Sequence, residues 1–241
     1  VSESDIMGLI SEVNATYPTA GLTRTDVLFQ YGGLRPIVEK ETSVEIEVYD
    51  ASRKYEIYDH AADDQIQGFI TVIGGKYTTS RNLAQQLVDL TLTKLERDPV
   101  PCLTHTTPLY GGEMSRYASF LDRAIKQRPA GLADKVIANL CRNYGTRYLD
   151  VFMSAEKKHL KLLCKHLPDI MAEVVYAMRA EMALSLSDVL FRRTGLCTLG
   201  NPGDDVIEAV ADCMAKNLKW SKARRMAEID KSMEQFETVT Q

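Results

Sequence analysis

The sequence predicts an α+β protein, in which a β-containing N-terminal part is followed by an all-α helical C-terminal part. Three observations carry this prediction. Short β-favouring runs, two of them ending at glycine pairs, lie in the first hundred residues. The stretch DPVPCLTHTTPLYGGE at 98–113 holds three prolines and is typical of a connector. Beyond it, apolar residues recur with the helical period of 3.6. We therefore expect one part at 1–97, a linker at 98–113 and a helical domain at 114–241.

The N-terminal part is expected to begin with a helix, because apolar residues within 5–14 have helical spacing. A turn at Pro18–Gly21 follows. β-branched and aromatic residues predict four strands, over residues 27–31, 44–49, 55–58 and 69–73. Leucines spaced from Leu83 to Leu95 predict a further helix of several turns.

The C-terminal part is expected to be helical throughout. Helices are predicted over residues 114–126, 132–143, 155–166, 169–183, 187–193, 204–218 and 221–236. Gly131, Gly145, Pro168 and the turn GNPGDD separate them.

The composition excludes several classes of protein. The 241 residues are 45% hydrophobic and 26% charged, as in an ordinary soluble globular protein. A net charge of −4 gives no indication of nucleic acid as a partner. Five scattered cysteines without a C-x-x-C pair indicate reduced thiols in a cytosolic setting. No run of 18 apolar residues predicts a membrane-spanning helix.

The sharpest local signal is GGKYTT at 74–79. A β-favouring run meets two glycines, then Lys76, then a helix start where Thr78, Thr79 and Ser80 could each act as cap. Glycines permit close backbone approach, and a helix N-terminus attracts electron-rich groups. An ordinary loop rich in capping residues would share the pattern. The G-x-x-x-x-G-K-[ST] spacing is absent, so a nucleotide triphosphatase is not expected.

Two arginine-containing turns could also bind an anion. In QYGGLRPI, Pro36 holds Arg35 on a stiff extended turn, which suits a guanidinium fork aimed at a carboxylate or phosphate. In DASRKYEI, Arg53 and Lys54 lie between two predicted strands. A surface arginine on a loop and a solvated hairpin tip are the alternatives.

Other clusters favour structural roles. The group His159, Cys164 and His166 has poor metal-ligand spacing, so no metal is expected. The basic stretch KNLKWSKARRMAEIDK at 216–231 could rest on an anionic membrane surface, although a solvated helix face is the favoured interpretation. No Ser-His-Asp or Cys-His constellation can be assembled, and no G-x-G-x-x-G follows a strand.

Several stretches resemble, in order, the C-terminal portion of FAD-dependent glycerol-3-phosphate dehydrogenases. They are GGLRPI, ASRKYEI, TVIGGKYTTSRNLAQQLVD, AEMALSLSDVLFRRT and the tail LKWSKARRMAEIDKSMEQF. The resemblance covers nearly the whole chain, and its G-G-K-x-T-T-x-R and D-V-L-x-R-R segments are the most specific.

The resemblance implies FAD-dependent oxidation of sn-glycerol 3-phosphate to dihydroxyacetone phosphate. Electrons would pass to a quinone, and the protein would be cytoplasmic and peripheral on the cytoplasmic membrane. Residues 1–97 would be the end of an FAD/substrate-binding domain of the flavoprotein, capped by a helical domain without chemistry of its own.

The resemblance also implies roles for individual residues. A flavin-binding loop would consist of Gly74, Gly75, Lys76, Tyr77, Thr78 and Thr79. Its helix start would stabilise negative charge around the flavin N1–C2=O region when hydride arrives. Lys76 would be catalytic and would add a charge near flavin or substrate, while Arg35, Arg53 and Lys76 would bind the substrate.

The departures from the family matter. The family's N-terminal FAD motif is absent and the chain opens on VSESDIM, so we expect a fragment, a processed piece or a split subunit. Its partner would be the N-terminal FAD-binding part of the same protein, and the isolated chain would be inactive and free of FAD. Cys197 and Cys213 alone do not form the cysteine-rich segment of the anaerobic relatives. The alternatives are a non-catalytic helical assembly module and a flavoenzyme of the amino-acid-oxidase type with a carboxylate clamp.

Overall fold

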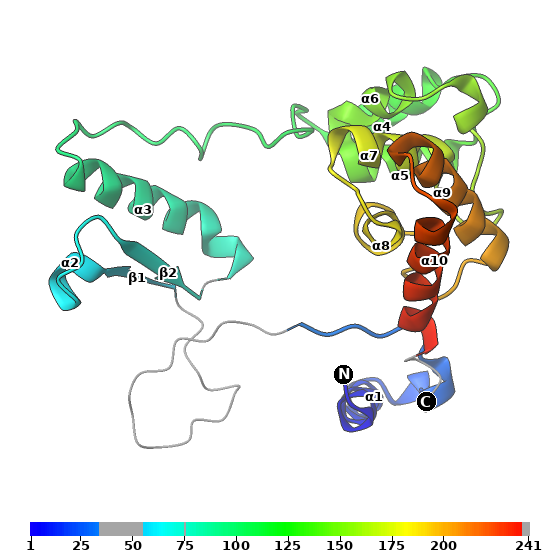
Figure 1. The fold of residues 1–241 in the computed structure, drawn as a ribbon, viewed down its shortest axis with the longest axis horizontal. Helices are drawn as coiled ribbons and strands as arrows, with labels where there is room; N and C mark the ends of the chain where they lie inside the picture. The colour runs from blue at the N-terminus through cyan, green and yellow to red at the C-terminus, as the bar shows by residue number, and fades with distance from the viewer. Residues whose placement is uncertain (34–54, 75, 238–241) are drawn as a thin grey trace. The chain divides into compact units, whose positions relative to one another are not determined.

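The computed structural model describes residues 1–33, 55–74 and 76–237. The chain divides into two compact units (Figure 1). Residues 1–31 and 109–241 form the helical unit, and residues 32–108 form the hairpin unit. The assignment of residues 1–97 to a flavin domain stays a prediction; the contacts add that the first 31 residues group with the C-terminal helices. The strand predicted at 44–49 lies outside the described residues.

The first helix, α1, spans Glu3–Thr16 and matches its prediction. It begins at Ser2 because a capping box forms there: the Ser2 side chain accepts from the backbone N–H of Asp5 at 3.2 Å, and the Asp5 carboxylate accepts from the Ser2 N–H at 2.8 Å. Pro18 opens the predicted turn that follows, a short 3₁₀ helix.

The hairpin unit contains an antiparallel pair, β1 (Glu56–Asp59) and β2 (Ile70–Ile73), in the register Glu56↔Ile73 to Asp59↔Ile70. The short helix α2 (His60–Asp63) lies between them, and α3 (Ser80–Lys94) follows. Two predicted strands and one predicted helix are thereby confirmed. The Tyr55 hydroxyl ties α3 to the start of β1, since it accepts from the side-chain amides of Asn82 and Gln86 at 2.9 Å each.

The hairpin unit lacks a buried core in its described part. Every described residue from Tyr55 to Pro108 is exposed or half-buried. Phe69 is 52% exposed and Val88 on α3 is 55% exposed. The sheet and helix therefore leave apolar surface uncovered.

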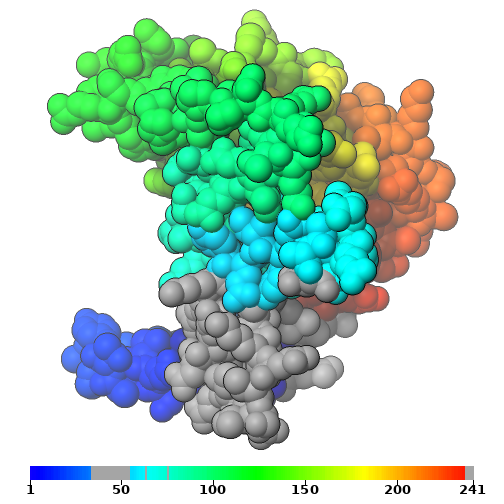
Figure 2. All heavy atoms as spheres, turned by 90° about the vertical axis from the view of Figure 1, so that its left-hand side faces the viewer, coloured from blue at the N-terminus to red at the C-terminus, as the bar shows by residue number. Residues whose placement is uncertain are grey.

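The helical unit has two apolar cores that share one helix, α7 (Met171–Ala180). In one core, α7 packs against α4 (Tyr117–Lys126), α5 (Asp134–Tyr144) and α6 (Tyr148–Met153). The atoms of α4 to α6 gather in the green mass of Figure 2. We call this the α4–α7 core.

The other, the α7–α10 core, brings three further helices and a turn onto α7. They are α8 (Leu186–Asp188), the π-helical turn Val189–Arg193, α9 (Asp204–Leu218) and α10 (Lys222–Glu237). Because α7 contributes residues to both cores, it is buried nearly all round, as expected for a central helix.

The connector at 98–113 has no helix or strand, as predicted. Its end docks on the helical unit, where the Gly111 carbonyl accepts from the Thr146 N–H at 2.9 Å. A Cβ added at Gly145 would lie 1.9 Å from the Gly111 oxygen. Glycine is therefore required at position 145, which also has φ +55°.

Two predictions are wrong. Residues 27–31 form no strand, because Phe29 packs instead on rings of the helical unit. Residues 155–166 form no helix beyond the 3₁₀ turn Lys157–His159. There the chain bends back, and Leu162 pairs with Ile170 in an isolated antiparallel bridge. Tertiary pairing overrides a good local propensity.

No helix in the described ranges is long and apolar enough to cross a membrane.

Candidate functional site

The loop from Gly74 to Ser80 joins β2 to α3. Gly74 has φ +74°, a left-handed conformation that glycine adopts without a steric cost. Lys76 is extended, at φ −92° and ψ 148°, and precedes a 3₁₀ turn, Tyr77–Thr79. A strand, a glycine-containing turn and a helix start therefore follow each other directly, as the sequence predicts.

The hydroxyl groups of this loop do not cap the helix. The Thr79 hydroxyl donates to the Lys76 carbonyl at 3.0 Å, and the Ser80 hydroxyl donates to the Tyr77 carbonyl at 2.8 Å. Of the three predicted cap residues, Thr79 occupies the cap position, but its side chain makes no capping hydrogen bond.

This helix N-terminus keeps its positive character. The first turn of α3 contains no acidic residue. Lys76 is exposed, and no ion pair to it is found within the described ranges. Tyr77 is 100% exposed. A lysine ammonium and the positive end of a 15-residue helix therefore face outward together.

Arg81, the last residue of G-G-K-x-T-T-x-R, received no role from the sequence. Its guanidinium donates to the side chains of Gln85 at 3.0 Å and Thr104 at 3.3 Å. Hydrogen bonds from Thr104, with a smaller contribution from the Arg81 charge, lower the pKa of the Cys102 thiol. Arg81 thereby links the start of α3 to the connector. The sequence signal that could have identified this residue is its position at the end of the G-G-K-x-T-T-x-R motif.

Three predicted site residues, Arg35, Arg53 and Gly75, lie outside the described residues. Whether they gather with Lys76 stays a prediction. Gly74 and the residues Lys76 to Thr79 lie on one loop, where Lys76, Tyr77 and Thr78 are exposed.

The loop combines three features that suit binding of an electron-rich group. It offers a glycine without a Cβ for close approach, an unneutralised helix N-terminus and an exposed ammonium. These are groups that stabilise electron density on a neighbouring ring or phosphate. The sequence contains no G-x-G-x-x-G loop for a pyrophosphate.

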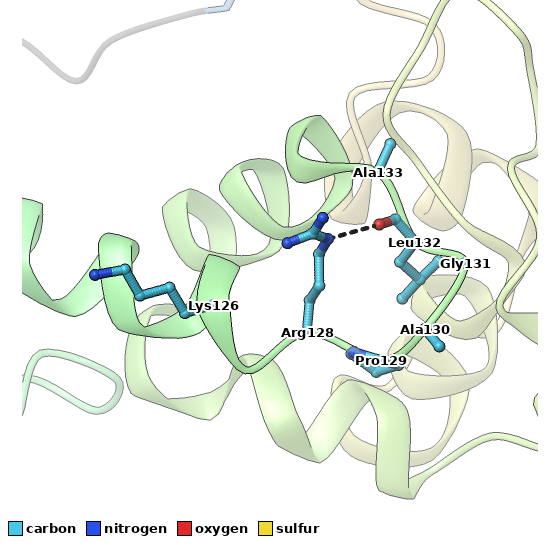
Figure 3. Close-up of a pocket in the computed structure, with 7 residues that line it drawn as sticks. All are labelled: Lys126, Arg128, Pro129, Ala130, Gly131, Leu132 and Ala133. Atoms are coloured by element: carbon cyan, nitrogen blue, oxygen red, sulfur yellow. Dashed lines mark hydrogen bonds between the residues drawn. The ribbon is translucent and has the colours of Figure 1, made fainter.

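A surface hollow of about 530 Å³ lies elsewhere, on the loop between α4 and α5 (Figure 3). Its Arg128 guanidinium donates to the carbonyls of Leu132 at 3.0 Å and Ile125 at 2.8 Å, and pairs with Asp134 at 3.1 Å. The Arg128 guanidinium is engaged by groups of its own loop and of α5, so it does not offer a two-pronged contact to an anion in the hollow.

Buried carboxyl groups lie in the α4–α7 core. Glu173 is fully buried, and burial raises its pKa to about 8. One of its oxygens accepts from the Ile170 N–H at 2.9 Å. The neighbouring Asp169 is 2% exposed, and burial raises its pKa as well. Glu173 therefore satisfies a backbone N–H at the N-terminus of α7, which is a structural role.

The basic stretch at 216–231 pairs partly with acidic residues. Arg225 contacts Asp212 at 2.6 Å, and Arg224 lies 3.7 Å from Glu228 with its guanidinium 5.0 Å from the Trp220 ring centre. These contacts suit a solvated helix face, and the membrane alternative stays a prediction. Across the described ranges, no three His, Cys, Asp or Glu residues come together as metal ligands.

Comparison with known proteins places these features in context. Residues 102–225 match the family model for the C-terminal domain of alpha-glycerophosphate oxidase. A glycerol-3-phosphate dehydrogenase of Synechocystis is 33% identical over 239 residues, which are 98% of this chain and 42% of that protein. The aerobic glycerol-3-phosphate dehydrogenase of Bacillus subtilis is 31% identical over 224 residues, or 89% of this chain and 39% of that protein.

A solved structure is similar along the same length. The glycerol-3-phosphate dehydrogenase of Bacillus halodurans, crystallised in complex with FAD, matches with a TM-score of 0.76 and 25% identity. The match covers 98% of this chain and 45% of that one. The chain therefore spans about two fifths of the length of the relatives it matches.

Proposed function

Because this chain belongs to the family of the C-terminal domain of alpha-glycerophosphate oxidase, we propose that it works as the C-terminal portion of an FAD-dependent glycerol-3-phosphate dehydrogenase. The reaction is the oxidation of sn-glycerol 3-phosphate to dihydroxyacetone phosphate. The observation that carries the proposal is the exposed, unneutralised loop Gly74–Ser80 within a chain that resembles such enzymes over nearly its full length.

FAD, when bound, supplies the acceptor for the hydride. Gly74, Gly75, Tyr77, Thr78 and Thr79 form the loop against it. Gly74 lets the backbone approach closely, and the N–H groups at the start of α3 stabilise negative charge.

The cationic side chains bind the substrate. Arg35 and Arg53 hold the phosphate, because a planar guanidinium matches two phosphate oxygens. The Lys76 ammonium adds a charge near the flavin or the substrate. It is exposed and without an ion pair among the described residues, so it is available for this role.

The partner of the loop is the FAD-binding part of the same protein, which supplies the remaining walls. The uncovered apolar surface of the hairpin unit, with Phe69 52% and Val88 55% exposed, supports such a covering partner. We further propose a quinone as electron acceptor, and a peripheral place at the cytoplasmic membrane.

The direct test is activity of the chain assembled with its FAD-binding part. The assembled protein should reduce a quinone analogue when glycerol 3-phosphate is added, and should act poorly on glycerol. Equal turnover of both alcohols would contradict the proposed substrate. Transfer to dioxygen instead of the quinone would leave the substrate assignment in place and correct the acceptor.

A further inference from the structure

One tyrosine side chain links the start of α3 to the strands of the hairpin unit. The Tyr55 hydroxyl oxygen accepts hydrogen bonds from the side-chain amides of Asn82 and Gln86, at 2.9 Å each. Asn82 and Gln86 are one helical turn apart on α3, so both donors lie on the same face of the helix. The two lone pairs of one oxygen therefore hold the first two turns of α3.

Tyr55 lies at the end of the sheet from which the loop Gly74–Ser80 leaves. It immediately precedes Glu56, the first residue of β1, and Glu56 is the register partner of Ile73. Ile73 is the last residue of β2 and directly precedes Gly74. The loop therefore begins beside the residue that binds the helix at which the loop ends. Tyr55 joins the two ends of the loop across its base.

A second polar contact fixes the other end of the helix. The Lys94 ammonium pairs with the Asp59 carboxylate at 2.5 Å, and these are the last residues of α3 and β1. Lys94 follows Asn82 along a helical rise of about 18 Å. The two contacts together define the direction of α3 alongside β1, an arrangement that Figure 1 shows.

Burial does not supply the same constraint within the hairpin unit. No residue in the described part of this unit is buried, and the apolar residues of α3 are half-buried or exposed. Apolar contact is non-directional, whereas a hydrogen bond restricts both distance and angle. The orientation of the start of α3 therefore depends on the Tyr55 hydroxyl more than on packing.

The orientation of this helix start decides which charge it can stabilise. The positive end of a helix acts through the N–H groups of its first turn, and the effect declines within that turn. The first turn of α3 contains no acidic residue, and Lys76 lies on the loop just before it. Dipoles that are held in place before the reaction do not have to reorient when charge develops, so a fixed orientation favours catalysis.

We propose that Tyr55 is a positioning residue for the flavin reaction, acting through Asn82 and Gln86 on the loop Gly74–Ser80 and the N-terminus of α3. Its hydroxyl holds these groups in the orientation that stabilises negative charge on the reduced flavin. This inference rests on the proposed function. It gives a task to one hydroxyl and two side-chain amides that the family resemblance leaves without a role.

The test compares Tyr55→Phe with Tyr58→Phe in the assembled flavoenzyme. Tyr55→Phe keeps the ring and removes the acceptor of both amides. Tyr58 is the matched control because it lies on β1 and its hydroxyl donates to Glu56 at 2.5 Å, a contact that does not involve α3.

Tyr55→Phe should make the flavin reduction potential more negative and lower kcat about 10-fold, less than the roughly 10²-fold that a 1 Å misplacement can cost. KM for glycerol 3-phosphate should change less, because the groups proposed to bind the phosphate are retained. Tyr58→Phe should leave the potential, kcat and KM unchanged.

A third variant tests the route of the effect. Gln86→Met keeps a long side chain and removes one of the two donors, so it should give a smaller loss of kcat and a smaller shift of the potential. Combined with Tyr55→Phe it should add nothing, because both changes break the same hydrogen bond. Additive losses would overturn the inference. If Tyr55→Phe does not retain flavin, Gln86→Met carries the measurement, and a wild-type potential in that variant overturns the inference.

The outcomes separate this inference from the proposed function. If the wild type prefers glycerol 3-phosphate over glycerol while Tyr55→Phe keeps the wild-type potential and kcat, the inference is wrong and the proposed function stands. A loss of stability without a change in potential has the same meaning, because it assigns Tyr55 to the fold alone. A wild type that binds no flavin, or that shows no preference for the phosphorylated alcohol, would contradict the proposed function itself and the inference with it.

Discussion

The helical unit and the hairpin unit differ in how much of their apolar surface they cover. In the helical unit, Ile137, Leu140 and Leu190 are fully buried within two cores. In the described part of the hairpin unit no residue is buried, and Val88 on its long helix is 55% exposed. The first unit can therefore balance the entropy of folding by its own burial, whereas the described part of the second leaves its apolar surface exposed.

This contrast separates stability from chemistry. Lys76 and the loop around it belong to the unit whose described part has no buried core, and Arg35 and Arg53 belong to the same stretch of the sequence. The buried carboxyl group of Glu173 belongs to the unit with a core. Substitutions in the two units should accordingly affect different measurements.

The largest expected effect is on catalysis, from Arg35→Ala in the assembled enzyme. If Arg35 grips the phosphate, its loss leaves a desolvated dianion poorly paired. Charge-assisted hydrogen bonds contribute about 1.5–3 kcal/mol, and more where a buried charge loses its partner, so kcat/KM should fall about 10²-fold or more. Steady-state kinetics with glycerol 3-phosphate measure this loss.

Two controls accompany that measurement. Arg35→Lys should recover only part of the activity, because an ammonium cannot form a two-pronged contact. Turnover of glycerol should hardly change in Arg35→Ala. Equal losses with both alcohols would assign Arg35 to the fold or the flavin instead.

The next largest effect is on stability and compares matched leucines in the two units. Leu140→Ala in the α4–α7 core should lower the free energy of unfolding by about 2–5 kcal/mol, through lost burial and a cavity. Leu90→Ala on α3, a half-buried position, should cost less than about 1 kcal/mol in the chain alone. Denaturant unfolding followed by circular dichroism measures both. Equal losses of unfolding free energy in the two variants would contradict the difference in burial between the units.

Glu173 should make the stability of the helical unit depend on pH, and the sign of this dependence follows from the direction of its pKa shift. Burial raises its pKa to about 8, above the ordinary value of 4.5. The folded state therefore binds more protons than the unfolded state, and stability falls as pH rises from about 5 to 8. The loss should be on the order of 2 kcal/mol, because relaxation reduces the full penalty of a buried charge.

Glu173→Gln isolates this contribution. The amide oxygen can still accept from the Ile170 N–H, and the side chain carries no charge at any pH. Its unfolding free energy should stay flat over the same pH interval, apart from a smaller contribution of the neighbouring Asp169. A variant that declines with pH as the wild type does would show that another group is responsible.

The smallest predicted effect comes from Lys76→Met, which keeps the length and removes the charge. A charge that helps the reduced flavin acts on the transition state, so kcat should fall about 10-fold while KM rises less. The flavin reduction potential should become more negative. An unchanged potential together with an unchanged kcat would exclude Lys76 from the site.

Much of the fold could be predicted from the sequence, because strongly periodic segments decide their own structure. The helices around Leu83–Leu95 and at 204–218 have the 3.6-residue apolar period in their own sequence, and the structure contains both. The helix predicted over 155–166 is absent because the backbone of this segment pairs with the stretch before α7, a contact that no local pattern reveals. The six-residue α6 was too short to show a period.

The candidate site was predictable in its loop and not in its surroundings. Glycine at 74 and lysine at 76 carry a local signal, since strand, turn and helix start are adjacent in sequence. The contacts of Arg81 with Thr104 and of Phe29 with Phe191 join residues far apart in the chain. Such pairs depend on the packed fold, so single-sequence reasoning could not find them.

The central claim is that the helical unit is stable by its own burial and that the hairpin unit is completed by the FAD-binding part. Native-state hydrogen exchange tests it most directly, first on the chain alone and then on the chain assembled with that part. Alone, amides of α5, α7 and α9 should exchange slowly and those of β1, β2 and α3 rapidly, with the sample colourless. On assembly, α3 and the hairpin should become protected as yellow flavin is bound. Slow exchange of α3 in the chain alone, equal to that of α7, would contradict the account.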